Sequence, residues 1–148
     1  MAGALRRPST APSLPRVRRG GRAGGSLSDV EIRSLHRAEP TTTADGSTIR
    51  SLLDLGTAPV RHQSLAEATL PPGGATQRHY HGELEEIYYV TSGRGEVEID
   101  GVRATVEPGD AILIPPGAWH QITASGDDEL AFLCCCAPPY RHEDTYFS

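Results

Sequence analysis

Short strand-like segments separated by tight-turn signals fill the chain from Ser64 to Ala137, and this rhythm constrains the fold more than any other feature. The segments are SLAEATL (64–70), EIYYV (86–90), EVEI (96–99), VRATV (102–106), AILI (111–114), WHQIT (119–123) and LAFLCCC (130–136). The turn signals between them are PPGG, TSGRG, DG, EPGD, PPGA and SGDDE. Short strands with turns every 8–12 residues or so are typical of an all-β sandwich or barrel.

The dipeptide Asp100-Gly101 is the strongest of these turn signals. It lies between two segments of alternating apolar and polar residues. Asp-Gly suits a two-residue hairpin because both central residues of that turn need positive φ angles. The sequence therefore predicts that 96–99 pairs with 102–106.

The 148 residues are enough for one domain with a real core. Residues 1–28 form a low-complexity Arg/Pro/Gly-rich tail that cannot bury a core, so we expect it to be disordered. The single domain is expected over 29–148, with its regular part at 64–137. Within 29–62, we expect a first strand at 30–35 and a short strand or helical turn near 47–55, separated by the turn-rich link PTTTADG.

Charge and composition exclude several functions. Six of the 14 basic residues lie in residues 1–28, which contain no acid, so the remaining 120 residues carry a net charge of −11. An acidic domain is a poor partner for nucleic acid, and no apolar run is long enough for a membrane helix. All basic residues are arginine, which excludes lysine chemistry. The three consecutive cysteines, Cys134 to Cys136, favour buried thiols in a reducing cytoplasm.

Two histidines, His79 and His81, share one face of a strand because positions two apart point the same way. Their imidazoles can converge on one metal ion. The next strand offers Glu85 or Glu86, which point to opposite faces, and alternation alone does not choose between them. A further histidine, His120, follows the turn PPGA and begins another alternating segment.

At these residues the sequence resembles the cupin superfamily. Its first motif, G-x5-HxH-x3–4-E-x6-G, is matched by Gly73, His79, His81, Glu86 and Gly93. Its second motif, G-x5-PxG-x2-H-x3-N, is matched by Gly109, Pro115, Gly117 and His120. The final asparagine is replaced by Ala124, a departure that concerns the surroundings of the site more than its ligands. The resemblance covers roughly residues 64–137.

The resemblance implies a double-stranded β-helix, which is a small jelly-roll barrel. It also implies one divalent transition metal (iron, manganese, zinc, nickel, cobalt or copper) held by His79, His81, Glu86 and His120. The spacing to Gly93 identifies Glu86 as the carboxylate ligand. Three imidazoles and one carboxylate leave open coordination positions, where a substrate or oxygen can bind.

We therefore expect a metal-dependent enzyme that acts on a small molecule, with isomerase, lyase or dioxygenase chemistry. The alternative is a non-catalytic cupin that binds or senses a small ligand. A homodimer is plausible, because similar barrels commonly dimerise.

Other residues are candidates for the pocket. Gln77 has the same parity as the two histidines and lines the pocket or lies at the strand edge. Tyr88 faces inward if Glu86 does, where it holds a substrate or fills the barrel. Cys134 and Cys136 share a face that could look into the barrel. The C-terminal segment 137–148 covers the barrel mouth or, as the favoured interpretation, lies on the surface.

Overall fold

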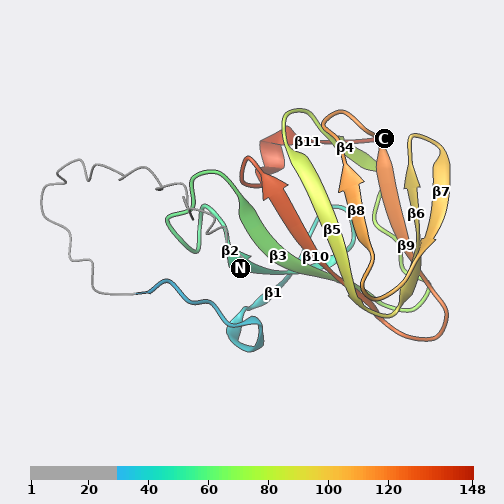
Figure 1. Ribbon diagram of the computed structural model, residues 1–148, viewed down its shortest axis with the longest axis horizontal. Coiled ribbons are helices and arrows are strands. Elements are labelled where there is room, and N and C mark those ends of the chain that lie inside the picture. The colour runs from blue at the N-terminus through green and yellow to red at the C-terminus, as the bar shows by residue number, and fades with distance from the viewer. Residues whose placement is uncertain (1–29) are drawn as a thin grey trace, which may run out of the picture. The chain divides into compact units, whose positions relative to one another are not determined.

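The computed structural model describes residues 30–148, and the expectation of a disordered tail at 1–28 lies outside the described residues. Eleven strands are present in this part of the chain (Figure 1). They are β1 (Pro40–Thr42), β2 (Thr48–Leu53), β3 (Ser64–Leu70), β4 (His79–His81), β5 (Glu85–Ser92), β6 (Arg94–Ile99), β7 (Val102–Val106), β8 (Ala111–Ile114), β9 (His120–Ser125), β10 (Leu130–Ala137) and β11 (Thr145–Phe147). Two 3-10 turns, η1 (Leu35–Arg37) and η2 (His142–Asp144), are the helical elements of the described part. No helix within 30–148 has the length and apolar character needed to cross a membrane.

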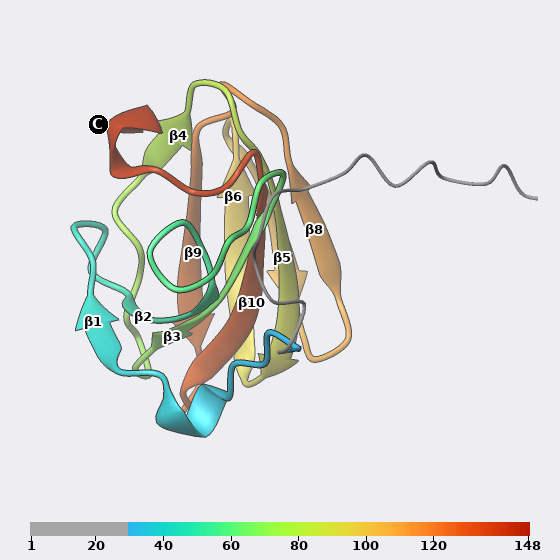
Figure 2. The ribbon, with the colours of Figure 1, turned by 90° about the vertical axis from the view of Figure 1, so that its left-hand side faces the viewer.

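The strands form two sheets, and within each sheet every pair of neighbouring strands is antiparallel. One sheet has the order β1-β2-β3-β10-β5-β8 and the other β11-β4-β9-β6-β7. Apart from β1-β2-β3 and β6-β7, the neighbours in each sheet are distant in sequence, as expected for a jelly roll (Figures 1 and 2). The predicted fold class, an all-β double-stranded β-helix, is confirmed.

The hydrophobic core lies between the two sheets. The first sheet contributes inward residues such as Leu70, Val90 and Phe132, each at most 1 % exposed. The second sheet contributes Val97 and Ile122. On β5 the exposure alternates strictly from Glu85 to Val90, because successive strand side chains point to opposite faces. The same alternation determines which side chains reach the barrel interior.

The predicted hairpin is confirmed. Residues 95–99 of β6 pair with 102–106 of β7, and Ile99 lies opposite Val102. Asp100 has φ 48° and Gly101 has φ 86°, so both central residues adopt the left-handed conformation that this turn requires.

The prediction for the segment before the barrel is partly wrong. Residues 30–34 form no strand, and Val30 and Ile32 are 84 % and 74 % exposed. Their apolar pattern finds no partner strand to pack against. The supposed link at 40–46 instead begins with β1, which pairs with β2, so the second expected element is a strand and not a helical turn.

The C-terminal segment 137–148 is mostly exposed, as the favoured interpretation expects, but Tyr140, Thr145 and Phe147 also reach the barrel interior. Its strand β11 pairs with β4 at all three positions, and Thr145 lies opposite His81. A three-residue strand is too short to show an alternating pattern in the sequence, so its partner is decided by tertiary contacts.

Candidate metal centre

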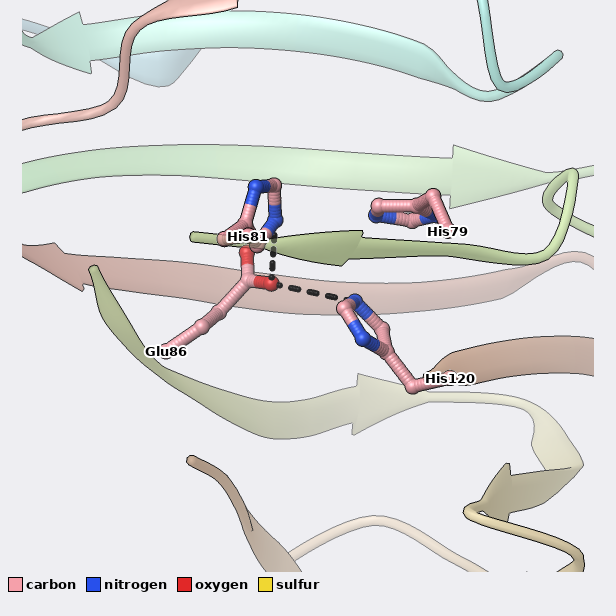
Figure 3. Close-up of side chains that lie close together, drawn as sticks. All are labelled: His79, His81, Glu86 and His120. Atoms are coloured by element: carbon pink, nitrogen blue, oxygen red, sulfur yellow. Dashed lines mark hydrogen bonds and ion pairs between the residues drawn. The ribbon is translucent and has the colours of Figure 1, made fainter. Parts of the chain in front are cut away.

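Four buried side chains converge between the two sheets: His79, His81, Glu86 and His120 (Figure 3). One ligand atom from each lies within 4.8 Å of those of the other three. The exposed fraction of each residue is 4 % or less. These are the four residues that the sequence motifs select.

The strand arrangement explains the convergence. His79 and His81 lie on β4, and His79 is directly opposite His120 on β9. Glu86 comes from β5 in the other sheet, where it lies opposite Cys136 of β10. The barrel therefore brings three imidazoles from one sheet against one carboxylate from the other.

The structure also chooses between the two candidate carboxylates. Glu86 is 4 % exposed and points into the barrel, whereas Glu85 is exposed on the outer face of β5. The strict alternation of β5 places the two on opposite sides of the sheet. Glu83 is likewise outside the cluster, in the loop before β5, where its carboxylate lies 3.8 Å from Arg141.

Each imidazole is held from behind through Nδ1. His79 Nδ1 donates to the carbonyl of Gln77 at 2.7 Å, and His120 Nδ1 donates to the carbonyl of Ala118 at 3.0 Å. Because a carbonyl only accepts, the Nδ1 atoms carry the protons when the rings are neutral. The Nε2 lone pairs are then free for a metal ion. A ring N–H that donates to a carbonyl while the other ring nitrogen binds the metal is the usual arrangement for histidine ligands.

The inner atoms fit a cation. Glu86 Oε2 lies 3.2 Å from His81 Nε2 and 3.4 Å from His120 Nε2. His120 Nε2 is fully buried, and within the described residues it has no hydrogen-bond partner. A lone pair facing a carboxylate is repelled unless a proton or a metal cation lies between them. Two ligand atoms on one ion at about 2.1 Å can be at most about 4.2 Å apart, so only a small contraction of the cluster is needed.

Burial and neighbouring charge set the protonation of the cluster. Burial raises the pKa of Glu86, but His120 and His81, which when protonated donate hydrogen bonds and bring positive charge to the carboxylate, offset this effect and hold the pKa at about 2 in the absence of a metal. Burial and the nearby His120 lower the pKa of His79. The site therefore offers an ionised carboxylate and a neutral His79 at neutral pH, the protonation states that metal binding requires.

The cluster opens onto a cavity of about 920 Å³. His79, His81 and Glu86 line it, so ligands bound at the cluster face the cavity. The rest of the lining is mixed: Ile49, Ala66, Ala68, Phe132 and Phe147 give it apolar surface, and many Ser, Thr and charged side chains, such as Arg33, Arg37 and Asp45, also contribute.

The further pocket candidates have different positions. Tyr88 is 3 % exposed and lines the cavity, packed against Phe132. Gln77 is exposed and outside the lining, and its side chain donates to the carbonyl of Ser148 at 3.4 Å. Cys134 and Cys136 both face the cavity. The thiol of Cys136 donates to Glu86 Oε1 at 3.5 Å, which leaves Oε2 directed at the imidazoles.

Sequence reasoning missed three contributors to the site. Thr145 Oγ1 lies 3.1 Å from His81 Nδ1, and the ring of Phe147 lies 5.7 Å from that of His79. Thr76, 2 % exposed, lines the cavity and accepts a hydrogen bond from Ile122 N through its hydroxyl. The alternation of Thr145 and Phe147 about Tyr146 is the one sequence signal, and it is too short to be diagnostic.

The chain belongs to the cupin superfamily. The family model for the cupin domain matches residues 66–136, which include all four clustered residues. An uncharacterised protein of Methanocaldococcus jannaschii is 46 % identical over 109 residues, spanning 74 % of this chain and 87 % of that protein.

Two further similar proteins carry names that mention polyketides. The polyketide synthase CurC of Streptomyces cyaneus is 30 % identical over 93 residues, covering 63 % of this chain and 60 % of that protein. The crystal structure of the polyketide cyclase RemF from Streptomyces resistomycificus superimposes with a TM-score of 0.63 at 26 % identity, covering 80 % of this chain and 89 % of that one.

The depressed pKa of Glu86 predicts how the metal-free protein responds to acid. The folded value of about 2 lies below the ordinary carboxyl value, so ionised Glu86 stabilises the fold fully above about pH 4.5. This contribution is lost as the pH falls towards 2. The variant Glu86→Gln mimics the protonated form. We therefore expect the difference in free energy of unfolding between wild type and Glu86→Gln to shrink between pH 4.5 and 2, measured by urea unfolding.

The control is Glu85→Gln, at the exposed neighbouring position. Its difference from wild type should stay small at every pH. A Glu86→Gln difference that is constant from pH 5 to pH 2.5 would contradict the assigned ionisation.

Proposed function

We propose that this protein is a metal-dependent enzyme that acts on a bulky, largely apolar small molecule bound in the barrel. The observation that carries the proposal is the cluster of three imidazoles and one carboxylate at the wall of a cavity of about 920 Å³. His79, His81, Glu86 and His120 would hold one divalent transition metal. When bound, such an ion supplies Lewis acidity or oxygen activation at its open positions.

The size of the cavity supports the substrate class. Pockets for drug-sized ligands span about 300–1,000 Å³, and this cavity is near the upper end of that range. The apolar side chains Ile49, Phe132 and Phe147 contribute to its wall. A small dicarboxylate would leave most of this surface unfilled, whereas a multi-ring or long-chain ketone would bury it. The polyketide names of two similar proteins point the same way.

Proton donors are also present in the cavity wall. Burial raises the pKa values of Tyr88 and Tyr140, so both phenols stay protonated at neutral pH. Tyr140 is 39 % exposed, and its ring centroid lies 6.0 Å from that of His81. It can therefore both contact a bound ligand and exchange its proton with water. We assign Tyr140 as the first candidate for a proton donor.

The experiment uses two ligands of different size with the zinc-, iron- or manganese-loaded protein. Benzoylacetone presents an aromatic ring and two oxygens that can chelate a metal, and oxalate presents two oxygens without apolar surface. We expect benzoylacetone to bind in preference to oxalate, observed by its ultraviolet enolate absorbance and by calorimetry. Its consumption over time would support an enzyme.

The variant Ala66→Phe fills the apolar part of the cavity without changing a clustered residue. Ala66 lies opposite Cys134 in the sheet, and both line the cavity. We expect benzoylacetone binding to weaken at least tenfold while metal content is unchanged. The matched control Ala111→Phe adds the same ring at an exposed position of β8. Preference for oxalate, or equal effects of the two variants, would overturn the substrate class.

Tight binding of the ligand without turnover would favour the alternative, a cupin that binds or senses a small molecule. A cytoplasmic location and a homodimer stay predictions. The outward apolar side chains of Ile87, Tyr89 and Leu113, which are 40–55 % exposed on adjacent strands, favour the second of these.

A further inference from the structure

We propose that the C-terminal segment 141–148 belongs to the metal centre. Thr145 is the positioning residue in it, and its hydroxyl orients the imidazole of His81. The proposal rests on the metal site proposed above. It extends the site to a segment beyond the matched cupin motifs, which end before residue 137.

The first argument is a directed chain of hydrogen bonds. Thr145 Oγ1 lies 3.1 Å from His81 Nδ1 and donates to the backbone carbonyl of Arg141 at 3.4 Å. A metal ion on His81 Nε2 requires the ring proton on Nδ1. Thr145 Oγ1 can accept that proton while its own proton goes to the carbonyl, which only accepts. This arrangement supports the tautomer that metal binding needs, with the Nε2 lone pair free for an ion between His81 and Glu86 Oε2, which lies 3.2 Å from Nε2.

The histidine strand β4 has few other sheet contacts. On the β9 side it pairs at one position only, His79 with His120. On the other side β11 pairs with all three of its residues, from Thr145 opposite His81 to Phe147 opposite His79. The C-terminal strand therefore supplies most of the sheet pairing that holds the two histidine ligands.

The same segment holds the loop that connects the two kinds of ligand. The Asp144 carboxylate accepts hydrogen bonds from the backbone N–H groups of Glu83 and Leu84 at 3.0–3.1 Å. The carbonyl of Asp144 accepts from Gly82 N at 3.1 Å. Residues 82–84 connect His81 to the strand that carries Glu86. By holding this loop, Asp144 fixes the position of His81 relative to Glu86.

The two faces of β11 allow the orientation of His81 by Thr145 to be tested separately from the packing of β11 against β4. Thr145 and Phe147 face the cavity. Tyr146 points outward, where its ring stacks on Tyr80 with centroids 4.8 Å apart. Substitutions at 145 and 146 therefore test the inner hydroxyl and the outer packing of the same strand.

The test compares zinc affinities by competition with a chromophoric chelator. Thr145→Val keeps the shape of the side chain and removes the hydroxyl. We expect zinc binding to weaken about 10- to 100-fold, as is usual for the loss of an outer partner of a metal-binding histidine. Thr145→Ser should restore affinity close to wild type. The matched control Tyr146→Ala should weaken zinc binding far less than Thr145→Val.

A second measurement needs no variant. In the zinc-loaded wild-type protein, 15N NMR of the imidazoles should show the proton of His81 on Nδ1 and zinc on Nε2. Zinc on Nδ1 would overturn the proposal, because Thr145 would then have no Nδ1 proton to accept. Equal losses of affinity in Thr145→Val and Tyr146→Ala would also overturn it, because they would assign the effect to strand docking.

The outcomes distinguish this proposal from the proposed function. Wild-type protein that binds no zinc would refute the metal centre of the proposed function. Wild-type protein that binds zinc with an affinity unchanged by Thr145→Val would refute the role of Thr145 alone.

Discussion

His120→Ala is expected to abolish metal binding. His120 is fully buried, and its Nε2 atom has no hydrogen-bond partner within the described residues. Its replacement removes one of the four proposed ligands and leaves the Glu86 carboxylate with one imidazole fewer beside it. We expect wild-type protein grown with ample metal to contain about one transition-metal ion per chain, and the variant to bind at least about 100-fold more weakly. Elemental analysis and a metal titration measure both.

Thermal unfolding provides a second measurement of the same effect. Zinc at about 100 times its dissociation constant stabilises the native state by about 2.7 kcal/mol, so wild-type protein should unfold at a clearly higher temperature with zinc. The variant should show almost no such shift.

The control is Glu85→Ala, which removes an exposed carboxylate next to Glu86 in sequence. Its affinity for zinc should match the wild type. A large loss in Glu85→Ala together with a small one in His120→Ala would show that the wrong side chains have been assigned. Wild-type protein free of metal after such growth would contradict the site as a whole.

Gly93→Ala is expected to be the most destabilising small substitution in the barrel. Gly93 joins β5 to β6 with φ 76°, a conformation that costs other residues about 1–2 kcal/mol. A Cβ atom there would also overlap the backbone carbonyl oxygen of Glu129 and lie 2.9 Å from Leu130 Cα. Backbone atoms cannot rotate away as a side chain can. We expect a loss of about 3 kcal/mol or more in free energy of unfolding.

The matched control is Gly109→Ala. Gly109 also has a positive φ, 99°, but an added Cβ would meet no atom within 4 Å. Its substitution should therefore cost only the conformational strain of about 1–2 kcal/mol. Urea unfolding of the metal-free proteins measures both values. Equal losses for the two variants would mean that the loop at Glu129 moves aside.

The same comparison explains why a glycine occupies the end of the first cupin motif. The spacing from Glu86 to Gly93 identifies the inward carboxylate, and the structure supplies the reason for the glycine. The chain reverses direction at Gly93 directly against the backbone before β10, where no side chain fits.

Short apolar or alternating segments between turn signals were enough to predict the strands from Ser64 to Ala137, and the Asp100-Gly101 turn was enough to predict the hairpin of 96–99 with 102–106. Alternation failed before the barrel, where Val30 and Ile32 have the pattern of a strand but no partner. It also failed at 145–147, where three residues are too few to show a period.

The sequence by itself predicted the four clustered residues. Parity along a strand places His79 and His81 on one face, and the resemblance to the cupin motifs adds His120 and, through its spacing to Gly93, Glu86. Only the tertiary structure decided what surrounds these residues. The pairing of β11 with β4, which brings Thr145 to His81 across 64 residues, depends on contacts between segments that no local pattern connects.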